Sequence, residues 1–401
     1  MKKIVIIGNG CAGATALAQI RRKDKESGIV VFTRENHPFY YRPRLPEYLS
    51  GDTSINDFTM QSLSQYKEWN VDIHFGENVI SIDPEKKEVT GDKQGMVQYD
   101  ELLLASGSSC FLPPVKGNDK KGVYTLRTVD DADALMAAAG KTKNAILVGG
   151  GLLGLEAGRA LVKMGLKVEV VEFMDRLLPR QLDHESACLL QKQLESMGFS
   201  FHLSAKAQEV TGTETATGLT LADGKQLCGG IVLFSAGVRP NLELARLAGV
   251  ACDKAVKVDE YMRTSVPGIW AAGDATEFNG QPSGLWPIAL AQGKAAGLSM
   301  TGELTPYIPQ AAGTSLKVLG IDLVSAGNID TEKALPSKCF SKDNVYRKIV
   351  LDGDIIKGII FLGSTAGAND CIEALNKGKR LGSLADELDK EGFDFSRIKG
   401  I

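Results

Sequence analysis

The 401-residue sequence lacks several features that mark common classes of protein. None of its seven cysteines stands in a Cys-x-x-Cys or Cys-x-x-x-x-Cys pair, so neither a cysteine-bound cluster nor a local redox disulfide is expected. The four histidines, His37, His74, His184 and His202, have no partner at metal-ligand spacing. The sequence therefore predicts no metal site.

An excess of charge and a long apolar run are also missing. The formal net charge of -3 argues against a nucleic-acid partner, which normally requires a clear basic excess. No stretch approaches the ~18 apolar residues of a membrane-spanning helix. The opening MKKIVIIGNG has a short apolar run before Gly8, which predicts a first β-strand rather than a signal peptide. With an odd, scattered set of cysteines, these features predict a cytoplasmic protein without a membrane partner.

Glycine is abundant, at 44 residues or about 11% against a usual ~7%, and it clusters beside apolar strands. Two segments each read as strand, glycine turn, helix and strand. The first is KKIVIIGNGCAGATALAQIRR followed by IVVFTRE, and the second is NAILVGGGLLGLEAGRALVKMG followed by LKVEVVE. Their helices carry apolar residues at spacings of three and four. The pair predicts an α/β protein with two dinucleotide-binding folds.

The first glycine turn has the pattern Gly8-x-Gly10-x-x-Gly13. Gly8 allows the tight turn, Gly10 lets the backbone approach a diphosphate, and Gly13 lets the helix pack on the strand. Cys11 and Ala12 are interpreted as small residues of the same loop. The second turn repeats the pattern, and its candidate nucleotide-binding residues are Gly149, Gly151, Leu152, Leu153 and Gly154.

An acidic residue follows each glycine turn at the distance expected for a ribose-binding carboxylate. Glu35 lies 22 residues beyond Gly13, although Arg34 precedes it and both remain candidates. Glu172 lies 18 residues beyond the last glycine of the second turn. A carboxylate there favours NADH, because it repels the 2′-phosphate of NADPH, but Arg176 is four residues away and weakens this inference.

Several further segments resemble one family. They are YYRPRLPEYLSG (40–51), YDELLLASGS (99–108), SAGVRPN (235–241), TSVPGIWAAGDA (264–275), LWPIALAQGKAAGLSMTG (285–302) and TSLKVLGIDLVSAG (314–327). Together they resemble the FAD- and NAD(P)-dependent pyridine nucleotide-disulfide oxidoreductases. Within that superfamily the likeness is closest to the NADH:rubredoxin oxidoreductases and the flavoprotein module of NADH-dependent nitrite reductases. The resemblance implies a glutathione-reductase-like, two-dinucleotide-binding-domain flavoprotein that uses FAD and NAD(H).

The resemblance also implies roles for individual residues. Asp274 would bind the ribitol chain of FAD, Arg42 would contact its diphosphate, and Trp286 would help to cover the flavin, with Gln292 on the same stretch. The segments that return the chain from each dinucleotide domain contribute the further candidates Ala105, Ser106, Gly107 and Gly237. Ser106 stands where the family usually has Thr.

Two departures from the family bear on the reaction. Residues 42–47 hold no cysteine, whereas disulfide reductases have a pair there and peroxide or coenzyme A disulfide reductases have one. Disulfide and peroxide chemistry is therefore disfavoured. Glu47 stands where ferredoxin reductases of oxygenase systems have a Lys, which pairs with the Glu that matches Glu156. Both carboxylates are candidate catalytic residues beside the flavin, where each would raise the pKa of the other. The alternative that Glu47 faces solvent stays open.

The expected domains are a discontinuous FAD domain at 1–110 and 238–306, an inserted NAD domain at 111–237, and a C-terminal α+β interface domain at 307–401. In the last, a hairpin is predicted at Asp352-Gly353 and a helix over CIEALNKGKRL. By count, residues from 307 onward include 13 Lys or Arg and 13 Asp or Glu, so no net basic surface is expected there.

Three functions are consistent with these features. The first is an NADH oxidoreductase that passes electrons to a one-electron carrier, such as rubredoxin or a ferredoxin-like iron–sulfur protein. The second is an electron-transfer subunit that docks an iron–sulfur subunit in a larger complex, with the direction of electron flow, including towards NAD+ reduction, left open. The third is a binding flavoprotein that senses NADH. The oligomeric state is left open by the sequence.

Overall fold

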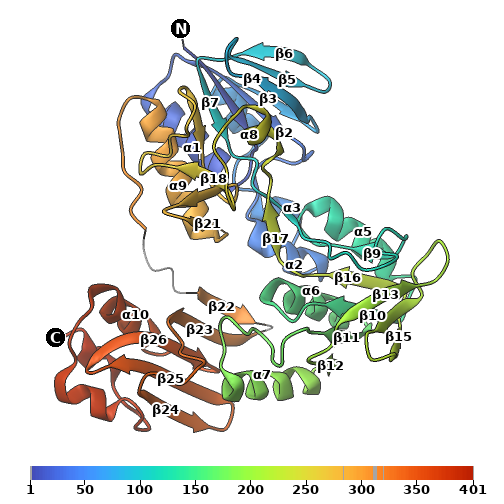
Figure 1. The fold of residues 1–401 in the computed structure, drawn as a ribbon, viewed down its shortest axis with the longest axis vertical. Helices are drawn as coiled ribbons and strands as arrows, with labels where there is room; N and C mark the ends of the chain where they lie inside the picture. Colours follow the sequence, from blue (N-terminus) through green and yellow to red (C-terminus); the bar gives the residue numbers. More distant parts are fainter. Residues whose placement is uncertain (1, 283, 310–313, 319, 401) are drawn as a thin grey trace. The chain divides into compact units, whose positions relative to one another are not determined.

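The computed structural model describes residues 2–282, 284–309, 314–318 and 320–400. The chain divides into two compact units (Figure 1). Each unit has its own clusters of buried hydrophobic residues. The first unit comprises Met1–Tyr48, Thr53–Cys110 and Val238–Pro309. The second unit comprises Leu49–Asp52, Phe111–Gly237 and Gln310–Ile401.

The centre of the first unit is a five-stranded parallel sheet in the order β19-β7-β1-β2-β3. Its strands are β1 (Lys3–Ile7), β2 (Gly28–Thr33), β3 (Val71–Phe75), β7 (Glu101–Leu104) and β19 (Ile269–Ala271). Alternate residues of β1 enter two cores, with Ile4 and Ile6 on one face and Val5 and Ile7 on the other. Both faces are covered, which explains why the strands are continuous apolar runs.

Different elements cover the two faces of this sheet. Helices α1 (Cys11–Lys23) and α9 (Trp286–Met300) lie side by side on one face (Figure 1). An antiparallel sheet and helix α8 (Glu243–Leu247) contribute residues to the core on the other face. The antiparallel strands are β4 (Val79–Asp83), β5 (Glu88–Gly91) and β6 (Gly95–Gln98). The remaining elements are η1 (Arg42–Arg44), α2 (Leu45–Leu49), α3 (Ile55–Phe58), α4 (Leu63–Glu68), β8 (Ser108–Cys110), β17 (Val238–Pro240), β18 (Val256–Val258), β20 (Thr276–Phe278) and β21 (Gln281–Pro282).

Helices α1 and α9 approach each other through glycines. A Cβ atom on Gly297 would stand 2.6 Å from the carbonyl oxygen of Ala16, and one on Gly293 would collide with the carbonyl oxygen of Ala12. Because these two glycines have no side chain, the backbone of α9 can pack directly on the backbone of α1. This contact fixes α9 beside the first turns of α1, where the first glycine loop ends.

The second unit contains another five-stranded parallel sheet, in the order β12-β11-β10-β16-β9. Its strands are β9 (Val123–Tyr124), β10 (Asn144–Val148), β11 (Lys167–Val171), β12 (Phe199–His202) and β16 (Ile231–Phe234). An antiparallel sheet of β13 (Ala207–Thr211), β14 (Gly218–Leu221) and β15 (Gln226–Cys228) shares a core with one face. The helices are α5 (Val129–Ala139), α6 (Leu152–Lys163) and α7 (His184–Ser196).

The C-terminal part of the second unit is an antiparallel sheet in the order β22-β23-β26-β25-β24. Its strands are β22 (Thr314–Val318), β23 (Ile321–Gly327), β24 (Ser337–Lys342), β25 (Val345–Asp352) and β26 (Ile355–Leu362). Helix α10 (Ala368–Lys377) packs on one face with η2 (Gly382–Glu387) and η3 (Phe395–Ile398). The predicted hairpin joins β25 to β26, and the predicted helix begins at Ala368, before the expected Cys371.

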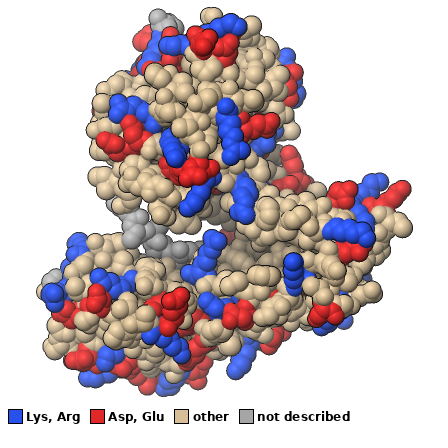
Figure 2. All heavy atoms as spheres, viewed as in Figure 1, with Lys and Arg blue, Asp and Glu red and all other residues tan. Residues whose placement is uncertain are grey.

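The distribution of charged side chains on the surface is consistent with the formal net charge of -3. On the face drawn in Figure 2, acidic and basic side chains are interspersed rather than gathered by sign. Within the described ranges, no helix has the length and apolar character needed to span a bilayer.

The contact between α1 and α9 predicts an effect on stability. Gly297→Val should lower the free energy of unfolding by about 1–3 kcal/mol, because the added carbons overlap the backbone of Ala16. Lys294→Val is the control, since it puts the same residue on an exposed position of α9, where the propensity change is below about 1 kcal/mol. Equal losses in urea-denaturation measurements of the two variants would contradict the packing argument.

Candidate functional site

A pocket lies over the first glycine loop, in the first unit. Five of its lining residues are among those predicted from the sequence: Gly10, Cys11, Glu35, Arg42 and Trp286. Six others were missed, namely Asn9, Thr33, His37, Pro38, Phe39 and Tyr40. Asn9, Thr33 and Tyr40 lie within segments quoted above, and His37, Pro38 and Phe39 directly precede the YYRPR segment, so their position was the signal that could have found them.

The three glycines of the first loop have different surroundings. Gly8 has a φ of +107°, and a Cβ atom there would collide with the carbonyl oxygen of Ala105. A Cβ atom on Gly13 would collide with the carbonyl oxygen of Gly8. By contrast, a Cβ atom on Gly10 would meet nothing within 4 Å. Gly8 and Gly13 therefore satisfy internal packing, whereas Gly10 leaves open space at the start of α1, as a bound diphosphate requires.

Glu35 and Arg42 meet inside this pocket. The Arg42 guanidinium donates to Glu35 Oε1 at 2.5 Å, and the Tyr40 hydroxyl donates to Glu35 Oε2. Burial opposes the charge of Arg42, but Glu35 and Tyr40 raise its pKa above the ordinary value. Arg34, the alternative to Glu35 in the sequence, is exposed and does not line the pocket. The pocket thus contains one carboxylate and one cation, the two groups predicted to meet a ribose and a diphosphate.

Asn9 adds an unsatisfied polar atom to the same pocket. Its Nδ2 donates to the hydroxyl of Tyr66 at 2.9 Å, while its buried Oδ1 has no hydrogen-bond partner. The side chain is 8% exposed. A buried acceptor without a partner is costly, so this oxygen is suited to a hydroxyl or amino group of a bound molecule.

Asp274 follows strand β19 and contacts the end of the segment 99–108, which is called the return segment below. The Ser108 hydroxyl donates to Asp274 Oδ2 at 2.8 Å. The loop before Asp274 is fixed by the buried amide of Gln292, whose Oε1 accepts from Gly273 N and Thr276 Oγ1 at 2.9 Å each. Gln292 therefore connects α9 to the loop that carries Asp274.

The return segment itself is held by a residue that the sequence analysis did not select. Asn241 Nδ2 donates to the carbonyl oxygen of Ser106 at 2.8 Å, and Asn241 N donates to that of Gly107 at 3.0 Å. The Ser106 hydroxyl donates back to Asn241 O at 3.0 Å. Asn241 ends the SAGVRPN segment, so its motif was recognised but its partner, 135 residues away, was not. Ala105, the first residue of this group, is buried beside Gly8.

Trp286 begins α9 and lies among aromatic side chains. Its ring stacks on Phe39 at 5.9 Å between centroids and meets Tyr41 edge-on at 4.9 Å. The Cys11 thiol lies 3.6 Å from the carbonyl oxygen of Trp286. Burial, with Asp274 nearby, raises the pKa of Cys11 to about 12. Cys11 is therefore a neutral thiol at physiological pH, and all seven cysteines are free.

The second glycine loop, in the second unit, shares this division of roles. Gly149 has a φ of +115°, and a Cβ atom there would collide with the carbonyl oxygen of Ser235. A Cβ atom on Gly154 would stand 2.8 Å from the carbonyl oxygen of Gly149, whereas one on Gly151 would meet nothing within 4 Å. Gly151 caps α6, whose first turn contains Leu152 and the partly exposed Leu153. Directly before β17, Gly237 is exposed, with a φ of +91°, and its carbonyl accepts from Phe111 N.

Glu172 lies against this second loop. Its Oε2 accepts from Gly150 N at 2.6 Å and its Oε1 accepts from Met174 N at 2.7 Å. The side chain is buried, so the carboxylate has a fixed position at the end of β11. Arg176 donates instead to Leu182 O and Pro179 O, both at 3.2 Å, and pairs with Asp175. Its guanidinium is therefore engaged by its own loop.

The two predicted catalytic carboxylates lie in different units. The Glu47 side chain is 53% exposed and pairs with Arg44 at 2.7 Å, three residues earlier. Glu156 lies on α6 and is partly buried. A role for this pair beside the flavin stays a prediction.

Comparison with known proteins connects both loops to one family. Residues 2–293 match the pyridine nucleotide-disulphide oxidoreductase family, and residues 313–379 match the rubredoxin NAD+ reductase C-terminal domain. The chain is 37% identical to a nitrite reductase [NAD(P)H] of Bacillus subtilis over 94% of this chain and 47% of that protein. It is 29% identical to an NADH-rubredoxin oxidoreductase of Clostridium acetobutylicum, over 96% of this chain and 97% of the relative.

A solved structure supports the same relationship. The crystal structure of NADH:rubredoxin oxidoreductase from Clostridium acetobutylicum is 27% identical, with a TM-score of 0.81 over 100% of this chain and 99% of that one. The chain spans about half the length of several curated relatives that it matches. The two glycine loops, their carboxylates and these similarities agree: the chain belongs to the pyridine nucleotide-disulphide oxidoreductase family, a family of oxidoreductases that use FAD and NAD(H).

Proposed function

We propose that this protein takes electrons from NADH through FAD and passes them to a one-electron carrier protein, with rubredoxin or a ferredoxin-like iron–sulfur protein as the partner. The observation that carries the proposal is the pairing of two nucleotide loops with a cysteine-free segment at residues 42–47. The similarity to an NADH-rubredoxin oxidoreductase over 97% of that protein's length supports the same acceptor class.

In the first unit, the pocket residues divide the work of holding FAD. Gly10 and the start of α1 would receive the diphosphate, and Arg42 would neutralise part of its charge. Glu35 would accept from the adenosine ribose, and Asp274, oriented by Ser108, would accept from the ribitol chain. When bound, FAD supplies the chemistry that accepts a hydride from NADH and releases electrons one at a time.

In the second unit, Glu172 would select NADH. Its carboxylate is buried and fixed by Gly150 N and Met174 N, so it would meet the 2′ position of an adenosine ribose seated on the loop. Arg176 bonds to carbonyl oxygens of its own loop, which leaves it poorly placed to receive a 2′-phosphate.

The exit for the electrons is argued from sulfur chemistry. Disulfide and peroxide reductases of this kind use a reactive thiol, and the thiolate is the nucleophile. Here residues 42–47 contain no sulfur, and the Cys11 thiol has a pKa of about 12. Oxygen would react slowly with a covered flavin, and Trp286 would help to cover it. A protein that carries single electrons is therefore the acceptor class proposed.

A second candidate function is that of an electron-transfer module in a larger assembly. The observation that favours it is that the chain spans about half the length of relatives described as nitrite reductases. In that arrangement an iron–sulfur subunit or domain would be the direct partner, and carrier proteins added from outside would be reduced slowly.

Gly10 gives a test of the FAD site. In Gly10→Ala the added methyl points into open space, so the fold should persist while flavin binding weakens by about 1–3 kcal/mol, or about 5- to 150-fold. The measurement is the dissociation constant for FAD, from flavin fluorescence. The control is Gly28→Ala at the start of β2, where the methyl also meets nothing within 4 Å. Unchanged FAD affinity in Gly10→Ala would remove this loop from the site.

Glu172 gives a test of nucleotide choice. NADH should reduce the flavin about 30- to 150-fold faster than NADPH at low nucleotide concentration, since ribose bonds and charge repulsion are worth ~2–3 kcal/mol. Glu172→Gln keeps a side-chain oxygen that can accept from a backbone N–H but removes the charge. Stopped-flow measurements should therefore show a smaller ratio of the NADH rate to the NADPH rate. Glu169→Gln is the matched control, on the strand that ends one residue before Glu172. Equal wild-type rates with both nucleotides would refute the assignment.

The acceptor is tested with the FAD-loaded protein and NADH. Reduction of purified rubredoxin and of a ferredoxin should be fast and should slow as salt rises, if charges steer a small, weak docking contact. Oxidised glutathione, coenzyme A disulfide and hydrogen peroxide should be reduced slowly. Ferricyanide, which needs no docking site, is the control for flavin content.

The outcomes separate the candidates. Rapid turnover with a thiol or peroxide substrate, and none with either carrier, would overturn the proposal. Rapid ferricyanide reduction with slow reduction of both carriers, restored by a co-purified iron–sulfur protein, would favour the module of a larger assembly.

A further inference from the structure

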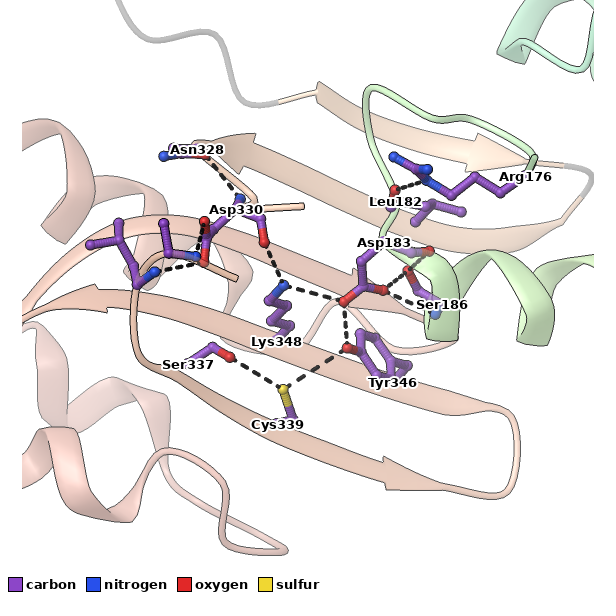
Figure 3. Close-up of polar contacts among 12 residues, drawn as sticks. Arg176, Leu182, Asp183, Ser186, Asn328, Asp330, Ser337, Cys339, Tyr346 and Lys348 are labelled. Atoms are coloured by element: carbon purple, nitrogen blue, oxygen red, sulfur yellow. Dashed lines mark hydrogen bonds and ion pairs between the residues drawn. The ribbon is translucent and has the colours of Figure 1, made fainter. Parts of the chain in front are cut away.

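A buried polar cluster joins the C-terminal sheet to helix α7 within the second unit (Figure 3). Asp183 caps α7, and its Oδ1 accepts from the backbone and side chain of Ser186 at 3.1 and 2.6 Å. Its other oxygen, Oδ2, accepts from the Tyr346 hydroxyl at 2.8 Å and lies 3.4 Å from Lys348 Nζ. Both partners come from β25, 163 and 165 residues further along the chain.

The two β25 residues are unusually buried for polar side chains. Tyr346 is 1% exposed and Lys348 is 4% exposed. Alternation along the strand explains their direction, because Ile349 and Leu351 enter the core against α10, and Tyr346 and Lys348 are on the opposite face. Lys348 also donates to the carbonyl oxygen of Asp330 at 3.3 Å.

The cluster depends on charge. A buried ammonium is strongly unfavourable without a partner, and removal of either member of a buried pair leaves an uncompensated charge. Burial also works against the Asp183 carboxylate, but hydrogen bonds from Ser186 and Tyr346, together with Lys348, hold its pKa below the ordinary value. Asp183 is therefore charged and fixed at one position.

The chain that leads to Asp183 packs on the second glycine loop. Leu178, in a left-handed conformation with a φ of +47°, donates from its backbone N to Gly150 O at 3.2 Å. The side chain of Leu177 lies 2.8 Å from where a Cβ atom on Gly150 would stand. Leu182 N in turn donates to Leu178 O at 2.9 Å. Hydrogen bonds and packing thus run without a break from Gly150 to Asp183.

We propose that Tyr346 and Lys348 are positioning residues for the NADH site, acting through Asp183. By holding Asp183, they keep residues 177–182 packed against Gly150, so that Glu172 and the glycine loop retain their spacing. The C-terminal sheet thereby sets the affinity of the second unit for NAD(H) without contacting it. The inference rests on the proposed function in one respect, because it takes residues 149–154 as the NAD(H) loop.

The test compares Tyr346→Phe and Lys348→Met with Lys357→Met in the FAD-loaded full chain. Lys357→Met is the control because it removes the same charge from the same sheet. Lys357 is exposed and pairs with Asp352. The readouts are the dissociation constant for NAD+ by calorimetry, and KM and kcat for NADH with ferricyanide. For the two cluster variants, the dissociation constant and KM should rise about two- to thirtyfold, with kcat and FAD content unchanged. Lys357→Met should match the wild type.

Tyr346→Phe keeps the test decisive if Lys348→Met fails to fold, because it removes a single hydroxyl. Tyr346→Phe added to Asp183→Asn should weaken NAD+ binding no further than Asp183→Asn alone, since both act through one carboxylate. Variants that lose thermal stability but bind NAD+ normally would overturn the inference and leave the cluster a structural contact. A wild-type protein that binds no NAD+ would instead overturn the proposed function itself.

Discussion

Close approach of backbone to backbone at the two glycine turns is the constraint on which both nucleotide sites depend. Gly8 and Gly149 have positive φ values and face carbonyl oxygens, of Ala105 and Ser235, where any side chain would collide. Each carbonyl belongs to the strand end next to the loop in its own sheet. Gly10 and Gly151 face open space instead. The absence of side chains thus lets the loop pack closely at one glycine and leaves open space at the other, as the proposed diphosphate site requires.

Helix α9 extends this constraint through the first unit. It packs on α1 through Gly293 and Gly297, and Gln292 on the same helix fixes the backbone of Gly273. Asp274 is therefore placed by a helix that also contacts the first turn of α1. Two residues expected to meet one FAD molecule, Gly10 and Asp274, are held by one packed interface.

Charged side chains then define what each proposed site offers to a ligand. Glu35 and Arg42 occupy the first pocket together, so the site combines an acceptor for hydroxyls with a cation for phosphates. Glu172 accepts hydrogen bonds from the backbone N–H groups of Gly150 and Met174 at the second loop. In the second unit, Asp183 uses one oxygen to cap α7 and the other to bind Tyr346 and Lys348, which connects the C-terminal sheet to the same loop.

The sequence by itself determined what depends on local patterns. The glycine spacings, the 3–4 apolar periodicity and the Asp-Gly turn predicted both dinucleotide folds and the β25–β26 hairpin, because each is decided by residues close together in the chain. Tertiary structure alone decided the rest. It placed Glu35 rather than Arg34 in the pocket, paired Ser108 with Asp274 across 166 residues, and brought Asp183 to Tyr346 across 163. Such partners are chosen by how the strands and helices pack, and no local pattern carries that information.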